Sequence, residues 1–121
     1  MSGKINLAEK FAAFTAQWTP KIVGEIDDYD IKLARIEGPF EWHAHADADE
    51  LFLVIEGEMD LELRDRTVSL VQGEIFVVPK GVEHKPVASA ECKILMLERK
   101  GTVNTGDGAP GARTVAAPER I

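Results

Sequence analysis

The chain has 121 residues and a mass of 13.3 kDa, which is the size of one domain, and its formal net charge is −7. An acidic chain without a run of basic residues is a poor partner for nucleic acid or for an anionic membrane. The single cysteine, Cys92, leaves no intramolecular disulfide to form, and the first twenty residues hold no apolar stretch of signal-peptide length. These features predict a cytoplasmic globular domain that engages neither nucleic acid nor a membrane.

Residues 1–20 are expected to form an N-terminal helical segment. Asn6 followed by Glu9 is a helix-start pattern, and apolar residues then recur at spacings of four and three, which places them on one helical face. The large apolar residues of the segment are Leu7, Phe11, Phe14 and Trp18. We expect the helix to end before Pro20.

Residues 21–100 contain short strand patterns separated by turn residues. The expected strands are 21–26, 30–37, 51–55, 58–64, 67–71, 75–78 and 93–98. Residues 58–64 alternate apolar and polar side chains, as in a strand with one buried face. Residues 51–55 and 75–78 are apolar on both faces, so we expect both to be central strands covered on two sides. The pattern predicts an all-β sandwich or barrel, followed by an irregular tail over residues 101–121.

The chain has three histidines, and their spacing is informative. His43 and His45 are two residues apart, so in an extended chain both imidazoles point to the same face. Glu50 opens an otherwise apolar strand, and His84 follows a strand and a tight turn that can return it to the first pair. An isolated pair of this kind is also found as ordinary exposed or hydrogen-bonded histidines, so spacing alone leaves both interpretations open.

The region from residue 38 to residue 84 resembles the two signature motifs of the cupin superfamily. The first motif is carried by Gly38, His43, His45, Glu50 and Gly57. The second is carried by Gly73, Pro79, Gly81 and His84. The short connection between the motifs is similar to that of small single-domain bacterial cupins. Two positions depart from the pattern: Gly38 is one residue nearer the histidine pair than usual, and Ala88 replaces an asparagine, which removes a structural hydrogen bond.

The resemblance implies a double-stranded β-helix, a jelly-roll barrel of two antiparallel sheets at residues 21–100. It also implies one divalent metal ion per chain, with the ligands His43, His45, Glu50 and His84. Three imidazoles and one carboxylate suit Fe, Mn, Ni, Co or Zn and are too rich in nitrogen for Mg or Ca. Four protein ligands leave two positions open on an octahedral ion, as a catalytic site requires. A cupin with an empty pocket is the alternative.

Residues next to the expected ligands are candidates for binding substrate. Glu41 shares the parity of the two nearby histidines, so it is a candidate catalytic general base or a hydrogen-bond acceptor beside the ligands, and an exposed residue at the end of a loop is the alternative. Phe40 and Trp42 are expected at the mouth of the site. Phe52 and Val54 share the parity of the strand's first residue and are expected to line the cavity. Such an apolar lining favours a small organic ligand.

The resulting hypothesis is a metal-dependent enzyme of the isomerase, lyase or dioxygenase type, acting on a small organic substrate at the ion. The alternative is a non-catalytic cupin module that binds or senses a small ligand through the same metal. Small cupins are similar in pairing along a sheet edge or by exchanging N-terminal strands. The apolar surface of residues 1–20 therefore predicts a homodimer.

Overall fold

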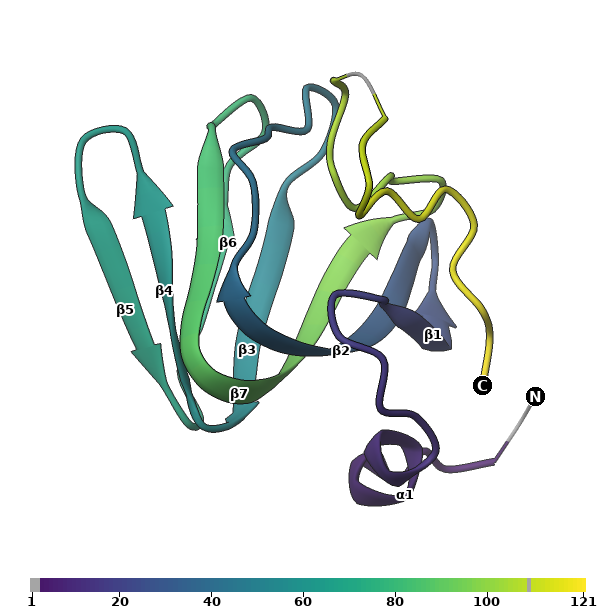
Figure 1. Cartoon of the computed structure of the whole chain (residues 1–121). Helices are drawn as coiled ribbons and strands as arrows, with labels where there is room; N and C mark the ends of the chain where they lie inside the picture. Colours follow the sequence, from purple (N-terminus) through teal and green to yellow (C-terminus); the bar gives the residue numbers. More distant parts are fainter. Residues whose placement is uncertain (1–2, 109) are drawn as a thin grey trace.

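The computed structural model describes residues 3–108 and 110–121 and contains one short helix and seven strands within them (Figure 1). In chain order these are α1 (Leu7–Ala12), β1 (Lys21–Ile26), β2 (Tyr29–Pro39), β3 (Glu50–Glu56), β4 (Glu58–Leu63), β5 (Thr67–Val71), β6 (Ile75–Val78) and β7 (His84–Arg99). No helix among these residues is long and apolar enough to span a lipid bilayer. The cytoplasmic location stays a prediction.

The strands pair antiparallel in a jelly roll whose barrel is not closed. One layer has the order β1-β2-β7-β3-β6, and the other contains β4 and β5. Strand β7 joins the layers because its first residues pair with β4 while its later residues pair with β2 and β3. In Figure 1 it bends between them, with β4 and β5 on the left. The predicted all-β jelly roll with a short N-terminal helix is confirmed.

Strand β7 is longer than the sequence predicts. Only residues 93–98 were expected to be extended, whereas the strand runs over 16 residues from His84. The segment before residue 93 contains Pro86, which lacks a backbone donor and disfavours a strand interior. Its carbonyl nevertheless accepts a hydrogen bond from the Phe40 amide at 2.9 Å, and β4 pairs along its other side. Tertiary pairing therefore extends the strand where local propensity does not.

Strand β6 lies at an edge, so the expectation of a central strand covered on both sides is wrong. Ile75 and Val77 are 57% and 46% exposed, and only Val78 is buried. A four-residue run that is apolar on both faces looks the same in sequence whether or not a second layer covers it. The similar run in β3 does occupy an interior position, between β7 and β6.

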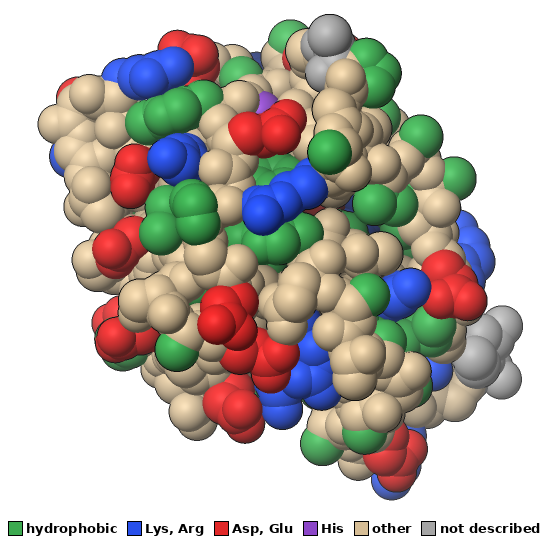
Figure 2. Space-filling model, viewed as in Figure 1, with side chains coloured by type: hydrophobic (Ala, Val, Ile, Leu, Met, Phe, Trp, Pro, Cys, Tyr) green, Lys and Arg blue, Asp and Glu red, His purple; other side chains and the backbone are tan. Residues whose placement is uncertain are grey.

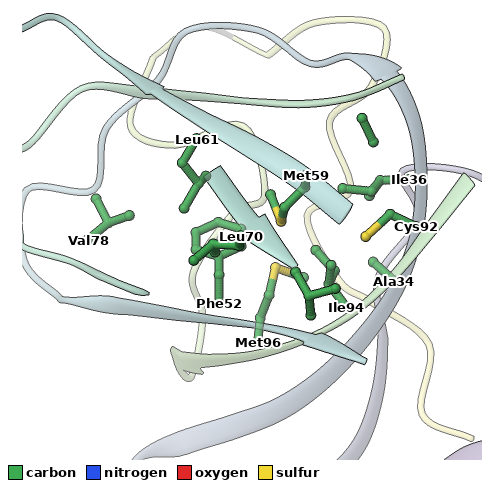
Figure 3. Close-up of a cluster of buried hydrophobic side chains, with 12 residues drawn as sticks. Ala34, Ile36, Phe52, Met59, Leu61, Leu70, Val78, Cys92, Ile94 and Met96 are labelled. Carbon is green, nitrogen blue, oxygen red and sulfur yellow. The ribbon is translucent and has the colours of Figure 1, made fainter. Parts of the chain in front are cut away.

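The core lies between the two layers (Figure 3). It is built from buried side chains of six strands: Ala34, Ile36, Phe52, Val54, Met59, Leu61, Leu70, Val78, Ala88, Cys92, Ile94 and Met96. Alternate residues of β3 and β7 supply it, since inward-facing positions in a strand recur every second residue. The same inward-facing positions, continued to the ends of these strands, lead to the polar site described below.

The N-terminal segment covers its own sheet. Asn6 caps α1, as predicted, by accepting a hydrogen bond from the Glu9 amide at 3.0 Å. Phe11 and Phe14 are buried against a second cluster that includes Leu33 of β2. The expectation that this segment leaves excess apolar surface for pairing is therefore wrong, because the segment folds back over its own chain. The homodimer itself stays a prediction.

Candidate metal centre

Three histidines and one glutamate, all buried, meet at one end of the jelly roll. His43 and His45 lie in the loop between β2 and β3, Glu50 is the first residue of β3, and His84 is the first residue of β7. One nitrogen or carboxylate oxygen from each lies within 4.8 Å of those of the others. The structure thus brings together the four residues predicted as ligands in an arrangement that could hold a metal ion.

Backbone hydrogen bonds hold the loop and the start of β7 together. The His43 amide donates to the His84 carbonyl at 3.1 Å, and the His84 amide donates to the His43 carbonyl at 2.9 Å. The Gly81 amide donates to the His45 carbonyl at 2.8 Å. Gly81 has a φ of +80°, which suits glycine in the turn that returns the chain toward the loop. The expectation that this turn brings His84 to the histidine pair is confirmed.

His43 and His84, which exchange backbone hydrogen bonds, each have a backbone carbonyl next to the Nδ1 atom of the imidazole ring. His43 Nδ1 lies 3.0 Å from the Glu41 carbonyl oxygen, and His84 Nδ1 lies 3.0 Å from the Val82 carbonyl oxygen. A carbonyl only accepts, so each Nδ1 carries the proton and each Nε2 keeps a lone pair. This is the tautomer in which a histidine binds a metal through Nε2.

Glu50 and His45 complete the donor set. Glu50 Oε1 lies 3.0 Å from His84 Nε2 and 3.6 Å from His45 Nε2. The latter nitrogen is buried and has no hydrogen-bond partner within the described parts of the chain. Buried polar atoms without a partner are rare in folded proteins. A divalent ion bound by these atoms would provide the missing partner, so the residues present fit a metal.

Burial sets the protonation of the four groups in the metal-free protein. Desolvation lowers the pKa of His43 to about 3, and it also lowers the pKa of His45 and of His84. Burial raises the pKa of Glu50 for the same reason, since it disfavours the charged form. The imidazoles are therefore neutral at physiological pH, which is the form that binds metal ions.

A pH experiment on metal-free protein tests this burial. Unfolding raises the pKa of His43 from about 3 to its usual value near 6.5. In the pH window between these two values, the unfolded state therefore takes up a proton and the native state does not. The free energy of unfolding of the wild type, relative to His43→Gln, should fall by up to about 1.4 kcal/mol per pH unit on acidification through it. Urea titrations with chelator present measure the difference. Parallel curves for the two proteins would contradict the assignment.

Sequence reasoning missed a row of charged residues beside the cluster. Asp30 of β2 pairs in register with Glu98 of β7, and the pairing of Leu51 with Leu97 aligns Glu50 with Glu98. All three carboxyl groups are buried, and Lys32, 1% exposed, lies beside them. Hydrophobic periodicity does not mark the buried residues of β2, because both of its faces carry apolar and charged side chains.

The charges of this row favour a divalent cation. Three carboxylates and one ammonium sum to −2 when all are ionised, and a bound divalent ion brings the sum to zero. Lys32 Nζ lies 3.4 Å from Glu98 Oε1, and the carboxyl group of Glu50 lies next to that of Glu98. Burial, followed by repulsion from Glu50, raises the pKa of Glu98 well above its usual range in the metal-free protein. Buried charge without compensation is costly, so the cluster is suited to a positive ion.

A cavity of about 30 Å³ adjoins the cluster, enough for about two water molecules. It is lined by Trp18, Pro20, Ala34, Ile36, Phe40, His43, Glu50, Phe52, Pro86, Ile94, Met96, Glu98 and Asn104. Phe40 and Phe52, predicted to bind substrate, are in this lining. All three histidines are buried, and in Figure 2 only a small part of one is visible, beside an acidic side chain and with apolar and basic side chains close by.

The other predicted pocket residues lie elsewhere. Val54 is fully buried in the core and is not part of the lining. Trp42 packs under the Arg64 guanidinium, 3.8 Å from its ring centre, and it too is outside the lining. Glu41 is exposed and contributes its backbone carbonyl to His43. Their roles in substrate binding or catalysis stay predictions.

The C-terminal segment contributes to one side of the cavity. Residues 101–108 and 110–121 form neither helix nor strand. Asn104, which lines the cavity, donates to the Arg113 carbonyl and accepts from the Val115 amide at 2.8 and 2.7 Å. The Arg113 guanidinium lies over the ring of Trp18, which stacks on Phe40. The segment therefore packs against the aromatic pair at one side of the cavity.

The same segment also supports the histidine loop. The Asp107 carboxylate accepts a hydrogen bond from the Ala46 amide at 2.6 Å, and its own amide donates to the Ala44 carbonyl at 3.1 Å. Gly106 has a φ of +80°, and a Cβ atom there would lie 2.4 Å from the Ala44 oxygen. Glycine at this position is what permits the tail to approach the loop so closely.

Comparisons with known proteins agree with this geometry. The family model described as Cupin_2, cupin domain, matches residues 33–98. A solved cupin-2 domain protein from Shewanella frigidimarina is 48% identical with a TM-score of 0.78, and the match covers 79% of this chain and 94% of that one. The uncharacterized protein YdbB of Bacillus subtilis is 34% identical over 96 residues, 78% of this chain and 79% of that protein.

A more distant similarity is to an enzyme. The 3-hydroxyanthranilate 3,4-dioxygenase of Xenopus laevis is 26% identical over 116 residues. The match covers 89% of this chain but 41% of that enzyme, so the chain spans less than half of the relative's length. The match of the family model, which spans more than half of the chain and includes all four clustered residues, shows that the chain belongs to the Cupin_2 family of cupin domains.

Proposed function

We propose that this cupin binds one divalent metal ion per chain, of the group Fe, Mn, Ni, Co and Zn, and that it is an enzyme acting on a small organic substrate at that ion. The observation that carries the proposal is the donor set of the buried cluster, three neutral imidazoles and a carboxylate within 4.8 Å of one another. Borderline transition-metal ions prefer this mixture. The adjoining row of carboxylates adds the negative charge that a divalent ion neutralises.

Of the three reaction types considered, dioxygenase chemistry has the most support. This support is the similarity to 3-hydroxyanthranilate 3,4-dioxygenases, which extends over part of the length of those enzymes. A divalent ion held by the four clustered residues would supply Lewis acidity and, if it were iron, redox chemistry. We therefore propose small aromatic compounds with adjacent hydroxyl or amino groups as the substrate class.

The residues of the chain would position such a substrate and exclude water. Phe52, Ile94 and Met96 form an apolar wall beside the cluster, and the stacked pair Trp18 and Phe40, with ring centres 4.7 Å apart, closes another side. Flat apolar walls suit an aromatic ring. The cavity of about 30 Å³ is smaller than one benzene ring, so residues that line it would have to move to admit the substrate.

A reconstitution experiment tests the proposal. Protein loaded anaerobically with Fe(II) should hold about one equivalent and should consume oxygen when 3-hydroxyanthranilate, 2-aminophenol or catechol is added. Glu50→Gln, which removes a ligand but keeps the shape of the side chain, is the matched control and should hold little iron and consume none. If the protein binds a full equivalent of iron but converts neither these compounds nor any compound in a metabolite pool, the proposal of an enzyme is wrong. That result would favour the alternative, a module that binds a small ligand without converting it.

The proposed partners are a small-molecule ligand and a second copy of the chain. The exposed apolar residues of β6, Ile75 and Val77, leave surface outside the N-terminal segment that a second copy would cover. Sedimentation should give roughly twice 13.3 kDa, and Val77→Lys should shift the protein toward the monomer. A single monomeric species at tens of micromolar for the wild type would contradict the homodimer.

A further inference from the structure

Trp18 lies between the cavity beside the metal cluster and a hollow on the surface of the protein. The cavity of about 30 Å³ and the hollow of about 310 Å³ have one lining residue in common, and that residue is Trp18. The other residues that line the hollow are Gln17, Thr19, Ala112, Arg113, Thr114 and Val115. The indole is therefore a partition between the cavity and an open hollow about ten times as large.

The backbone of Trp18 is strained in this position. Its φ is +56°, in the left-handed region, where a residue with a bulky side chain is an outlier. Its amide donates to the Arg35 carbonyl at 2.9 Å, which fixes the backbone next to β2. Non-glycine residues in such conformations cluster at ligand clamps and switch regions. The conformation of Trp18 therefore indicates a role beyond packing.

Three specific contacts hold the indole ring, in addition to its packing against the core. Its Nε1 donates to the Glu37 carbonyl at 2.9 Å, and the ring stacks on Phe40 with ring centres 4.7 Å apart. The Arg113 guanidinium lies 5.4 Å from the ring centre of Trp18. Arg113 is exposed and lines the hollow but not the cavity, so it lies on the hollow side of the ring. In the hollow, water can accept the hydrogen bond that Nε1 gives up.

The rest of the cavity wall is less able to move. Eight of the lining residues belong to the hydrogen-bonded strands β2, β3 and β7. Pro20, Phe40 and His43 are buried, and the side-chain amide of Asn104 is hydrogen-bonded through both its nitrogen and its oxygen. Trp18 is half-buried and adjoins open space, so it is the lining side chain best placed to move.

We propose that Trp18 is the gate of the cavity: its indole turns into the hollow to admit a small aromatic ligand, and it thereby determines the size of ligand that the metal centre accepts. This inference rests on the proposed function, since the ligand that passes the indole is one held at the metal. The space that the indole vacates joins the cavity and exposes the Phe40 ring, on which the ligand's ring can stack. Strain in the closed position makes it easier to leave.

A matched pair of hydroxamates tests the gate. Acetohydroxamate and benzohydroxamate bind divalent metals through the same two oxygens, and only the second carries an aromatic ring. Stopped-flow measurements of the visible absorption of cobalt(II) give their association rate constants for cobalt-loaded protein. Wild type should bind benzohydroxamate more slowly by about tenfold or more, because a minor open state is typically populated to about 10% or less. Trp18→Ala should reduce this difference to about twofold or less, because no opening is then required.

A second measurement follows the indole itself. The chain has two tryptophans, so in a Trp42→Phe background the fluorescence comes from Trp18 alone. Acrylamide should quench the fluorescence of zinc-loaded protein more strongly when benzohydroxamate is bound, because the indole then lies in the hollow. Acetohydroxamate, which needs less of the space behind the ring, should change the quenching less. Unchanged quenching at saturating benzohydroxamate would show that the ligand reaches the metal without moving the indole, and would overturn the gate.

A change at Arg113 tests the same gate without altering the indole. Arg113→Ala removes the guanidinium beside the ring and should raise the association rate of benzohydroxamate about two- to fivefold, the size of an exposed cation–π contact. Arg66→Ala is the matched control. It removes an exposed guanidinium 5.9 Å from the ring centre of Phe76, outside the hollow, and should leave the rate unchanged. This comparison decides the proposal if Trp18→Ala does not fold, and equal rates in the two arginine variants would then overturn it.

The outcomes distinguish this inference from the proposed function. The same rate difference between the two hydroxamates in wild type and in Trp18→Ala, with both proteins carrying cobalt, would overturn the gate and leave the metal centre intact. A wild type that binds both hydroxamates at equal rates would also overturn it. A wild-type chain that takes up no cobalt at all would overturn the inference together with the proposed function.

Discussion

His84→Ala should abolish metal binding while leaving the jelly roll folded. The substitution removes one of four donor side chains and also the imidazole that contacts Glu50 at 3.0 Å. Loss of a group that merely orients a ligand weakens metal affinity about 10- to 100-fold, so loss of a ligand should weaken it by at least about 100-fold. The hydrophobic core between the layers does not include this residue, so the strands should persist without the ion.

Elemental analysis measures the metal content of the variant, and circular dichroism measures whether its strands persist. Glu83→Ala is the matched control, because it changes the neighbouring residue, which is exposed and pairs only with Arg64 in the described structure. The control should keep about one equivalent of metal. A full equivalent in His84→Ala, in a folded protein, would show that the ion is bound by a different set of residues.

Lys32→Met should destabilise the fold severely. The ammonium is 1% exposed and is the cation in ion-pair contact with Glu98, in a row that also contains Asp30 and Glu50. Breaking a buried pair by removing one partner typically costs about 3–5 kcal/mol, because the other charge remains buried without compensation. Urea unfolding of metal-free protein measures the loss. The deficit should be smaller at pH 5 than at pH 8, since protonation neutralises a carboxyl group whose pKa is raised.

The double variant provides the internal check. Lys32→Met/Glu98→Leu replaces the pair by apolar side chains and should regain most of the lost stability, as buried pairs often do when both partners are replaced. If the single and double variants lose the same free energy of unfolding, the loss comes from packing around position 32. If Lys32→Met loses less than about 1 kcal/mol, the ammonium does not compensate the carboxylates.

The cluster of three histidines and one glutamate could be predicted from sequence because the spacing of its members is nearly local. His43 and His45 share a face at a separation of two residues, and Glu50 begins the strand that follows. The position of His84 could be predicted because it depends on one tight turn, which Gly81 permits with its positive φ. The resemblance to a known family then placed the residues of both motifs in one predicted site. The fold class followed from the same pattern of short strands and turns.

Asp30, Lys32 and Glu98 could not be predicted because register decides them. In β2 both faces carry apolar and charged residues, so hydrophobic periodicity does not show which face turns inward. The cross-strand pairing with β7 selects the face that carries Asp30 and Lys32. Trp42 presents a similar difficulty, since its contact with Arg64 depends on where the end of β4 lies relative to the loop.

The C-terminal segment adds contacts to the candidate site from outside the region that the family model matches. The family model ends at residue 98, whereas Asn104, Asp107 and Arg113, which contact the cavity mouth or the histidine loop, come later in the chain. The last strand, β7, ends at Arg99, so the residues after it act on the site through loop contacts. A chain trimmed to the matched residues would lose Asn104 from the cavity lining and the contacts of Asp107 with the histidine loop, so both the cavity and the cluster should change when the tail is removed.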